Sequence, residues 1–147
     1  MKLEIGSYCL ELDVDKTREG YRALSLPEEM GTEKQLFRYL LPRAAAESLH
    51  FLRSLGIDTE KLFLARPLAE PDERGEVLFL CIARLCGTLL KGGDTRPRQS
   101  EEAAGISMIF VGERAEFSLG HPALCEEETE MRFVIPLPFD PAFFETR

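Results

Sequence analysis

The most apolar run of the chain extends from Val77 to Leu90, between Gly75 and the pair Gly92-Gly93. Apolar residues occupy both the odd and the even positions of this run, which is typical of a β-strand that is covered on both faces. Glycines at either end are common boundaries of such a strand. The run therefore predicts a long strand buried within a sheet, with helices packed against one face.

Two cysteines, Cys81 and Cys86, lie five positions apart in this run. In a strand this odd spacing turns the two thiols to opposite faces, about 16 Å apart along the axis. In a helix it would separate them by about 140° around the axis. The two are therefore predicted not to form a disulfide with each other, and their spacing matches neither a zinc knuckle nor a Cys-x-x-Cys redox motif. We interpret each as a small buried hydrophobe.

The length of 147 residues fits a single domain, residues 1–147, because folding should remove roughly two-thirds of the accessible surface. The content of 44% hydrophobic and 30% charged residues is that of an ordinary globular chain. The formal net charge of -8 argues against nucleic acid and anionic membranes as partners, because neutralising phosphates requires a clustered basic surface. The predicted partner is another protein or a second copy of the chain.

The compartment is predicted from the cysteines and from the apolar segments. The N-terminus has no apolar run of signal-peptide length, and the run from Val77 to Leu90 contains Arg84 and is too short to span a bilayer. Four cysteines, Cys9, Cys81, Cys86 and Cys125, are scattered along the chain. A cytoplasmic protein with reduced thiols is the expectation.

The N-terminal segment reads as two short extended pieces. Apolar residues change from odd to even positions between Ile5 and Tyr8, so Gly6-Ser7 is predicted to form either a two-residue hairpin loop or a bulge. After Val14 the sequence is polar, and we expect a loop that continues to about Gly31.

Two consecutive helices are predicted between Thr32 and Gly56. Thr32 and Gln35 match a capping box for the first helix, whose apolar face ends at Leu41. Pro42 suits the first turn of a second helix that ends at Leu55, with Gly56 supplying a left-handed C-terminal position.

Strand signals dominate the rest of the chain. A short strand is predicted at Leu62–Arg66, a polar loop at Gly92–Gly105 and a hairpin of Ile106–Val111 with Arg114–Leu119 around Gly112-Glu113. The last strand contains Met131 to Leu137, and Pro136 and Pro138 place its end at a sheet edge or outside the sheet. Together these elements predict an α+β fold: a single, mainly antiparallel sheet of about five or six strands, with the two helices packed on one face.

The segment around residues 121–130 concentrates side chains that can bind metals: His121, Cys125, Glu126, Glu127, Glu128 and Glu130. A metal site requires three or four of them to converge at about 2.0 to 2.3 Å, and Pro122 makes the helix that would bring this about doubtful. A nucleophilic pair of Cys125 and His121 would also need an orienting third group, which the sequence does not identify. We therefore favour a solvated loop that enters the last strand. His50, the only other histidine, falls on the polar side of its helix and is predicted to lie at the surface.

Two other segments have unusual composition. Lys91–Arg98 combines glycines with three cations and could surround a phosphate, but it lacks a P-loop pattern, so we interpret it as a basic loop. The C-terminus carries Phe139, Phe143 and Phe144, which would either fold back on the core or form a docking patch. Folding back is the preferred prediction.

Four stretches, KLEIGSYCLELDVDKTREGY, LRSLGIDTEK, ISMIFVGERAEF and MRFVIPLPF, together resemble a small group of uncharacterised bacterial proteins of similar length. The resemblance implies an α+β domain with one antiparallel sheet and a helical layer, and no established activity. Members of that group carry a Cys-x-Cys-x-x-Cys cluster where this chain has RALSLPEEMGTEK. Any metal bound by that cluster is therefore not transferred to this chain.

The sequence assigns no catalytic, cofactor-binding or metal-binding residue. The preferred interpretation is a non-catalytic binding or protein-interaction domain that acts through a sheet edge, the Lys91–Gly105 loop or the phenylalanine-rich tail. The alternative is a small metal-dependent or thiol hydrolase centred on residues 121–130. A self-associating structural protein is the third hypothesis.

Overall fold

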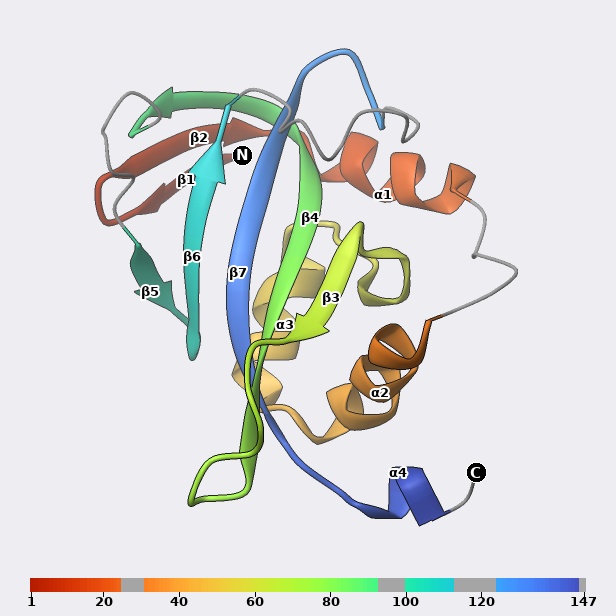
Figure 1. The fold of residues 1–147 in the computed structure, drawn as a ribbon. Coiled ribbons are helices and arrows are strands. Elements are labelled where there is room, and N and C mark those ends of the chain that lie inside the picture. Colours follow the sequence, from red (N-terminus) through yellow and green to blue (C-terminus); the bar gives the residue numbers. More distant parts are fainter. Residues whose placement is uncertain (25–30, 93–99, 113–123, 146–147) are drawn as a thin grey trace.

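The computed structural model describes residues 1–24, 31–92, 100–112 and 124–145, with the side chains of 144 and 145 excepted. Its elements in chain order are β1 (Lys2–Ile5), β2 (Tyr8–Leu12), α1 (Val14–Ala23), α2 (Thr32–Leu40), η1 (Leu41–Arg43), α3 (Ala46–Ser54), η2 (Thr59–Lys61), β3 (Leu64–Pro67), β4 (Glu76–Lys91), β5 (Glu101–Ala103), β6 (Ile106–Val111), β7 (Glu128–Pro138) and α4 (Ala142–Glu145). Figure 1 shows how the helices gather around one curved sheet.

The sheet is built around β4, which confirms the strand predicted from the apolar run. The strand order is β1-β2-β4-β7-β6-β5, and β3 also pairs with β4. All the pairings are antiparallel. The α+β class with one antiparallel sheet is therefore confirmed. In the part of the chain that the structure describes, no helix is long and apolar enough to cross a membrane.

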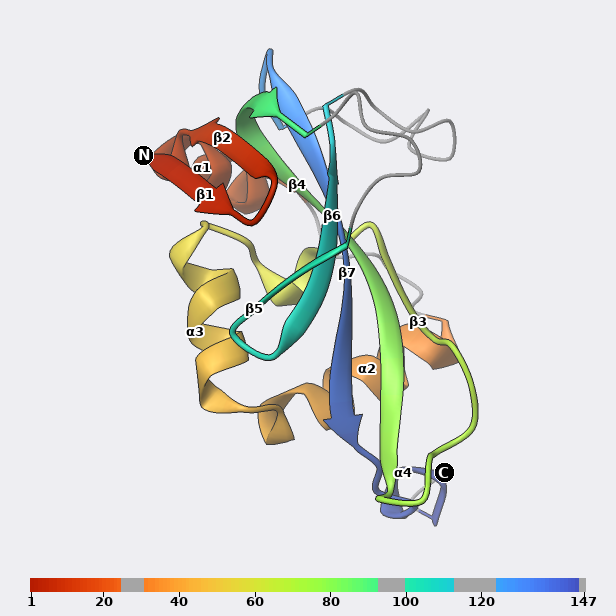
Figure 2. The same cartoon turned by 90° about the vertical axis from the view of Figure 1, so that its left-hand side faces the viewer.

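The sheet curls until its two end strands approach each other, as Figure 2 shows. The backbone N–H and the hydroxyl of Ser7, in the β1–β2 turn, both donate to Glu101 Oε1 in β5, each at 3.1 Å. Inside the curl, the ring of Tyr8 meets that of Phe110 edge-on, with centroids 5.2 Å apart. A single carboxylate therefore bridges the two edges of the sheet.

The two faces of β4 have different surroundings. Its odd-numbered residues from Val77 to Leu85 belong to the hydrophobic core, and α2 packs on them, with the Phe37 and Phe79 rings 5.4 Å apart. Cys81 is fully buried on this face, whereas Cys86 is buried outside the main core cluster. The predicted opposite orientation of the two cysteines is confirmed.

Of the two alternatives predicted at Gly6-Ser7, the hairpin loop is confirmed and the bulge is not, because Ile5 pairs with Tyr8. The predicted loop after Val14 is wrong. Helix α1 occupies its first part. Asp13 caps this helix by accepting from Lys16 N at 3.0 Å, and its buried residues are only Thr17 and Tyr21. Apolar periodicity could not reveal a helix whose buried stripe is a threonine and a tyrosine.

The two predicted helices exist with different boundaries. The N-cap of α2 is Gly31, and Thr32 is already helical, so the capping box is wrong. Pro42 lies within the short η1 turn, and α3 begins only at Ala46. Gly56 has φ +90, which confirms the left-handed position after the helix.

The C-terminal strand and tail largely follow the prediction. β7 lies between β4 and β6, but β6 reaches only as far as Val134, so Pro136 and Pro138 pair with β4 alone. Phe139 N donates to Gly75 O at 2.7 Å, and by alternation the two proline nitrogens face the open edge.

The ring of Phe143 is buried and Phe139 packs against the core, so these two residues fold back as predicted. The side chain of Phe144 lies outside the described residues. Asp140 fastens this tail: the Ala142 N–H, the Tyr39 hydroxyl and Arg43 all bind its carboxylate and lower its pKa.

The predicted loop Gly92–Gly105 is partly wrong, because residues 101–103 form β5 and turn into β6 through Ala104 and Gly105, both at positive φ. The second half of the predicted hairpin, Arg114–Leu119, lies outside the described residues.

Candidate functional site: an arginine-rimmed groove

Among the described residues, one edge of β4 has no strand partner between β3, whose pairing ends at Ile82, and β2, whose pairing begins at Gly87. Helix α1 fills this gap with side chains. The Tyr21 hydroxyl donates to Arg84 O at 2.9 Å and accepts from Arg84 N at 3.0 Å. Burial raises the pKa of the Tyr21 phenol well above its usual range, so the proton it donates is retained.

The N–H and C=O groups of Cys86, two residues further along β4, are bound in a similar way. Thr17 Oγ1 accepts from Cys86 N at 2.9 Å, and Asp13 N donates to Cys86 O at 2.8 Å. The buried side chains of α1 therefore form hydrogen bonds with backbone groups of β4 that a neighbouring strand would otherwise bind. Because these side chains are fixed on β4, the other side of α1 is held in a defined direction, and it carries Arg18 and Arg22 one turn apart.

The end of α3 is packed tightly against α1. A Cβ atom on Gly56 would lie 2.8 Å from Val14 O and 3.0 Å from Thr17 Cβ, so only glycine fits at this crossing. Beyond it, Asp58 caps the η2 turn by accepting from Glu60 N at 3.0 Å. Lys61 Nζ donates to Tyr21 O at 2.9 Å and ties this segment to the end of α1.

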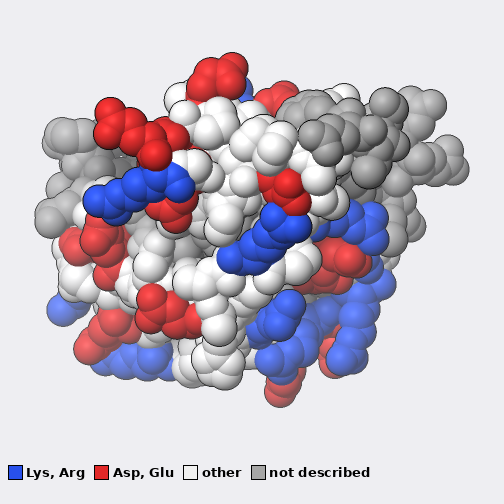
Figure 3. All heavy atoms as spheres, turned by 90° about the horizontal axis from the view of Figure 1, so that it is seen from below, with Lys and Arg blue, Asp and Glu red and all other residues white. Residues whose placement is uncertain are grey.

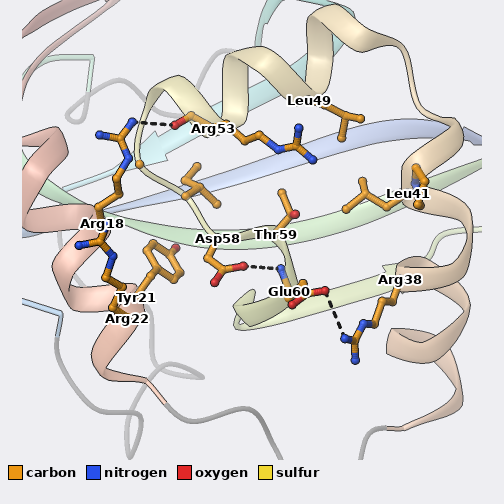
Figure 4. Close-up of a pocket in the computed structure, with 13 residues that line it drawn as sticks. Arg18, Tyr21, Arg22, Arg38, Leu41, Leu49, Arg53, Asp58, Thr59 and Glu60 are labelled. Atoms are coloured by element: carbon orange, nitrogen blue, oxygen red, sulfur yellow. Dashed lines mark hydrogen bonds and ion pairs between the residues drawn. The ribbon is translucent and has the colours of Figure 1, made fainter.

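These contacts leave a groove of about 620 Å³ between α1, η1, the ends of α2 and α3, and the segment from Gly56 to Glu60. Figure 4 shows that its walls come from different elements: Arg18 and Arg22 from α1, Arg53 and Leu49 from α3, Arg38 from α2 and Leu41 from η1. Its volume falls in the range of ligand sites, about 300 to 1,000 Å³.

The floor of the groove is apolar. Tyr21, Leu41 and Ile57 are buried there, Leu49 is half-buried, and Pro42 is exposed. The four arginines around the floor are all exposed. The site thus combines an apolar base with a cationic rim whose guanidinium groups remain in water.

The groove has an excess of positive charge in a chain of net charge -8. Four arginines line it against two carboxylates, Asp58 and Glu60. Arg38 pairs with Glu60 at 3.2 Å, and Arg18 donates to Arg53 O at 3.5 Å and approaches Asp15 at 3.8 Å. Within the described ranges, the guanidinium groups of Arg22 and Arg53 have no carboxylate partner. With respect to the described residues, they can therefore bind an added anion without breaking an ion pair.

The face seen from below carries acidic and basic side chains next to one another over most of its area, and several Lys and Arg side chains gather toward its lower right (Figure 3).

The thiols differ from the prediction in one respect. Cys86 and Cys125 form a disulfide, with Cα atoms 6.1 Å apart and 39 positions between them in sequence, so the expectation of reduced thiols is wrong for this pair. The register explains it: Cys86 pairs with Glu128 across β4 and β7, and Cys125 lies just before that strand. Cys9 and Cys81 are free and buried, and burial raises the pKa of the Cys81 thiol.

The segment 121–130 does not assemble as one site in the described residues. His121 lies outside them. Glu126 and Glu127 are exposed, as predicted for a solvated loop, but Glu128 and Glu130 belong to β7, where Glu130 is buried and pairs with Arg132 at 2.8 Å. In the described parts of the chain, no three His, Cys, Asp or Glu side chains are placed to hold a metal ion.

Two other predicted positions can be placed. His50 is exposed on α3, as expected. The basic loop Lys91–Arg98 falls mostly outside the described residues, and only Lys91, the exposed last residue of β4, and Gly92 are described.

Sequence reasoning missed Arg84 and the groove. Arg84 is 1% exposed, its guanidinium lies 3.9 Å from the centroid of the Phe63 ring, and Glu128 is 3.8 Å away. A single charge within an apolar run was the signal. For the groove, the signal was the i, i+4 spacing of Arg18 and Arg22, which has meaning only once α1 is known to be a helix.

Comparison with known proteins adds no relative: no protein-family model, curated protein or solved structure matches the chain. The resemblance to a bacterial group stays a prediction. The function must be argued from the groove itself.

Proposed function

We propose that the protein is a non-catalytic binding domain and that the arginine-rimmed groove is its recognition surface for an anionic partner, in the first place another protein. The observation that carries this proposal is the pair Arg22 and Arg53, which stand over an apolar floor without a carboxylate partner in the described chain. Guanidinium groups form strong, bidentate hydrogen bonds with carboxylates and phosphates. The groove therefore offers an anion guanidinium groups that can form such bonds next to an apolar surface.

The lining of the groove supports binding rather than chemistry. Histidine and cysteine, the most common acid-base and nucleophilic groups, are not among the described lining residues. The tyrosine in the floor holds its proton firmly and uses its hydroxyl for the backbone of Arg84. These residues can orient and hold a ligand.

The other binding surfaces suggested by the sequence have less support than the groove. Phe143 is buried and Phe139 is packed on the core, so these two rings contribute no docking patch. The two end strands of the curled sheet are joined where Glu101 of β5 binds the β1–β2 turn, so these edges contact each other there. The hydrolase hypothesis has no described site, because His121 is not described and the Cys125 sulfur is bonded to Cys86.

The test is a selection from a random-peptide phage library. The wild-type protein serves as bait, and the double variant Arg22→Glu with Arg53→Glu serves for counter-selection. We expect the recovered peptides to be enriched in Asp and Glu and to bind a control variant, Arg66→Glu with Arg74→Glu, as well as they bind the wild type. Arg66 and Arg74 are exposed and lie outside the groove. Peptides that bind the groove variant equally well would disprove the proposal.

The cytoplasmic location stays a prediction, and the disulfide provides a test of it. Disulfides are rare in the reducing cytoplasm and persist in oxidising compartments. When cells are quenched in acid and their proteins are alkylated under denaturing conditions, mass spectrometry should find Cys86 and Cys125 labelled if the protein is cytoplasmic; denaturation is needed because Cys86 is 1% exposed. If both remain unlabelled until a reductant is added, an oxidising compartment is indicated.

A further inference from the structure

We infer that the ligand of the groove is a short acidic segment of a polypeptide that carries one large apolar side chain between its acidic residues. This inference rests on the proposed function and goes one step further, because it names the ligand class. The apolar side chain lies on the floor, and the carboxylates on either side of it pair with the arginines of the rim.

The floor is what requires an apolar anchor. Leu49 is half-buried and Pro42 is exposed, next to the buried Leu41 and Ile57. A small, purely anionic ligand would leave this apolar surface in water. A Phe, Leu or Ile side chain would cover it and gain the free energy of removing both apolar surfaces from water.

The rim determines where the negative charges of the ligand must lie. Arg22 is on α1 and Arg53 is on α3, on different walls of the groove, as Figure 4 shows. Arg38 lies on the far side, where it shares its charge with Glu60 at 3.2 Å. An extended chain with acidic residues before and after its anchor can reach arginines on more than one wall.

Beside the apolar floor, Asp58 and Thr59 offer hydrogen-bond acceptors. Asp58 uses Oδ1 to cap the η2 turn, and in the described chain its Oδ2 has no hydrogen-bond partner. Thr59 lies beside it, half-buried. Acceptors in this position suit the backbone N–H groups of a peptide. The combination of cations, apolar floor and acceptors is that of a peptide site.

The experiment uses the most enriched peptide from the selection described above, made synthetically. Two derivatives are compared with it: one in which the large apolar residue is replaced by Ser, and one in which the acidic residues are replaced by Asn and Gln. Affinities are measured by calorimetry, and the binding site is mapped with amide NMR spectra of the full chain. We expect each derivative to bind about tenfold more weakly or worse, and the amide signals that change to lie around the groove.

Four outcomes decide the matter. If the Ser derivative binds as tightly as the parent while the uncharged one does not, the groove takes anions without an anchor, and the ligand class named here is wrong although the proposed function stands. If inorganic phosphate displaces the parent peptide completely at comparable concentration, a simple anion site is indicated and the inference is overturned. The same holds if phosphatidylglycerol vesicles bind in a manner that depends on the groove arginines.

If the selection yields no peptide that distinguishes wild type from the groove variant, the proposed function itself fails.

Variants of the groove provide the matched control. Arg22→Gln with Arg53→Gln should weaken the parent peptide about tenfold or more, and Arg66→Gln with Arg74→Gln should leave its affinity unchanged. Because all four side chains are exposed, the amide spectra of both double variants should show the native fold. Equal loss of affinity in the two double variants would show a nonspecific charge effect and overturn the inference.

Discussion

Arg84 and the groove arginines occupy opposite environments. Arg84 is 1% exposed, with its charge between the Phe63 ring and Glu128. Arg22 and Arg53 are exposed at the ends of their helices and meet no carboxylate in the described chain. One guanidinium is enclosed by the fold, while the other two have no carboxylate bound among the described residues.

The difference shows how the same side chain serves stability in one place and recognition in another. A buried guanidinium has lost its hydration, and the loss is offset only while its partners remain in place. An exposed guanidinium keeps its water and contributes little to stability. Substitutions at the two kinds of position should therefore have opposite effects on folding and on binding.

Removal of Arg84 should have the largest effect on stability. Arg84→Met removes a buried cation beside Glu128, whose side chain is 5% exposed, and this should lower the free energy of unfolding by about 3 to 5 kcal/mol. Urea denaturation followed by circular dichroism measures this change. The double variant Arg84→Met with Glu128→Leu should recover part of the loss. An unchanged urea midpoint for Arg84→Met would mean that the buried pair does not support the fold.

Removal of the disulfide comes next. Closing a loop of 39 residues should stabilise the fold by up to about 4 kcal/mol in the chain-entropy model. A dithiol reductant should lower the urea midpoint of the wild type and leave that of Cys86→Ala with Cys125→Ala unchanged. If reductant does not shift the wild-type midpoint, the disulfide either contributes nothing or does not form.

Tyr21→Phe should have a smaller effect than either. It removes the hydroxyl that serves both the N–H and the C=O of Arg84, at a cost of about 1 to 3 kcal/mol. The matched control is Tyr39→Phe, whose hydroxyl binds Asp140 at the surface and should matter less. Equal destabilisation by both changes would contradict the role of α1 as a substitute for a strand.

The pH dependence of stability gives a second test of the hydrogen bonds that Tyr21 forms with β4. The pKa of Tyr21 is raised in the folded protein, so its contribution to stability is present below the ordinary phenol pKa of about 10 and is lost as the pH rises further. The wild type should therefore lose stability in alkaline urea titrations more steeply than Tyr21→Phe. Parallel curves for the two proteins would show that Tyr21 ionises equally in the folded and unfolded chain.

The sequence was informative where a local pattern determines the structure. The glycine-bounded run predicted β4, the parity change predicted the Gly6-Ser7 hairpin, and the apolar tail predicted the burial of Phe143. Each of these follows from neighbours in the chain. The α+β class followed from the same signals.

The candidate site could not be predicted because it depends on contacts between distant segments. The buried stripe of α1 consists of Thr17 and Tyr21, which bind the backbone of β4 and give no apolar periodicity. The disulfide depends on the register of β4 with β7, which the spacing of cysteines does not reveal. The groove forms only when α1, α2 and α3 are placed together, so its arginines look like ordinary surface charges in the sequence.

The most direct test of the account is a paired measurement on Arg22→Gln with Arg53→Gln: its free energy of unfolding in urea and its affinity for the selected acidic peptide. We predict a change in unfolding free energy of less than about 1 kcal/mol, since these arginines contribute only weak interactions at helix ends. The affinity should fall about tenfold or more. A variant that is strongly destabilised, or that binds the peptide as tightly as the wild type, would contradict the claim that these arginines are held for recognition and not for folding.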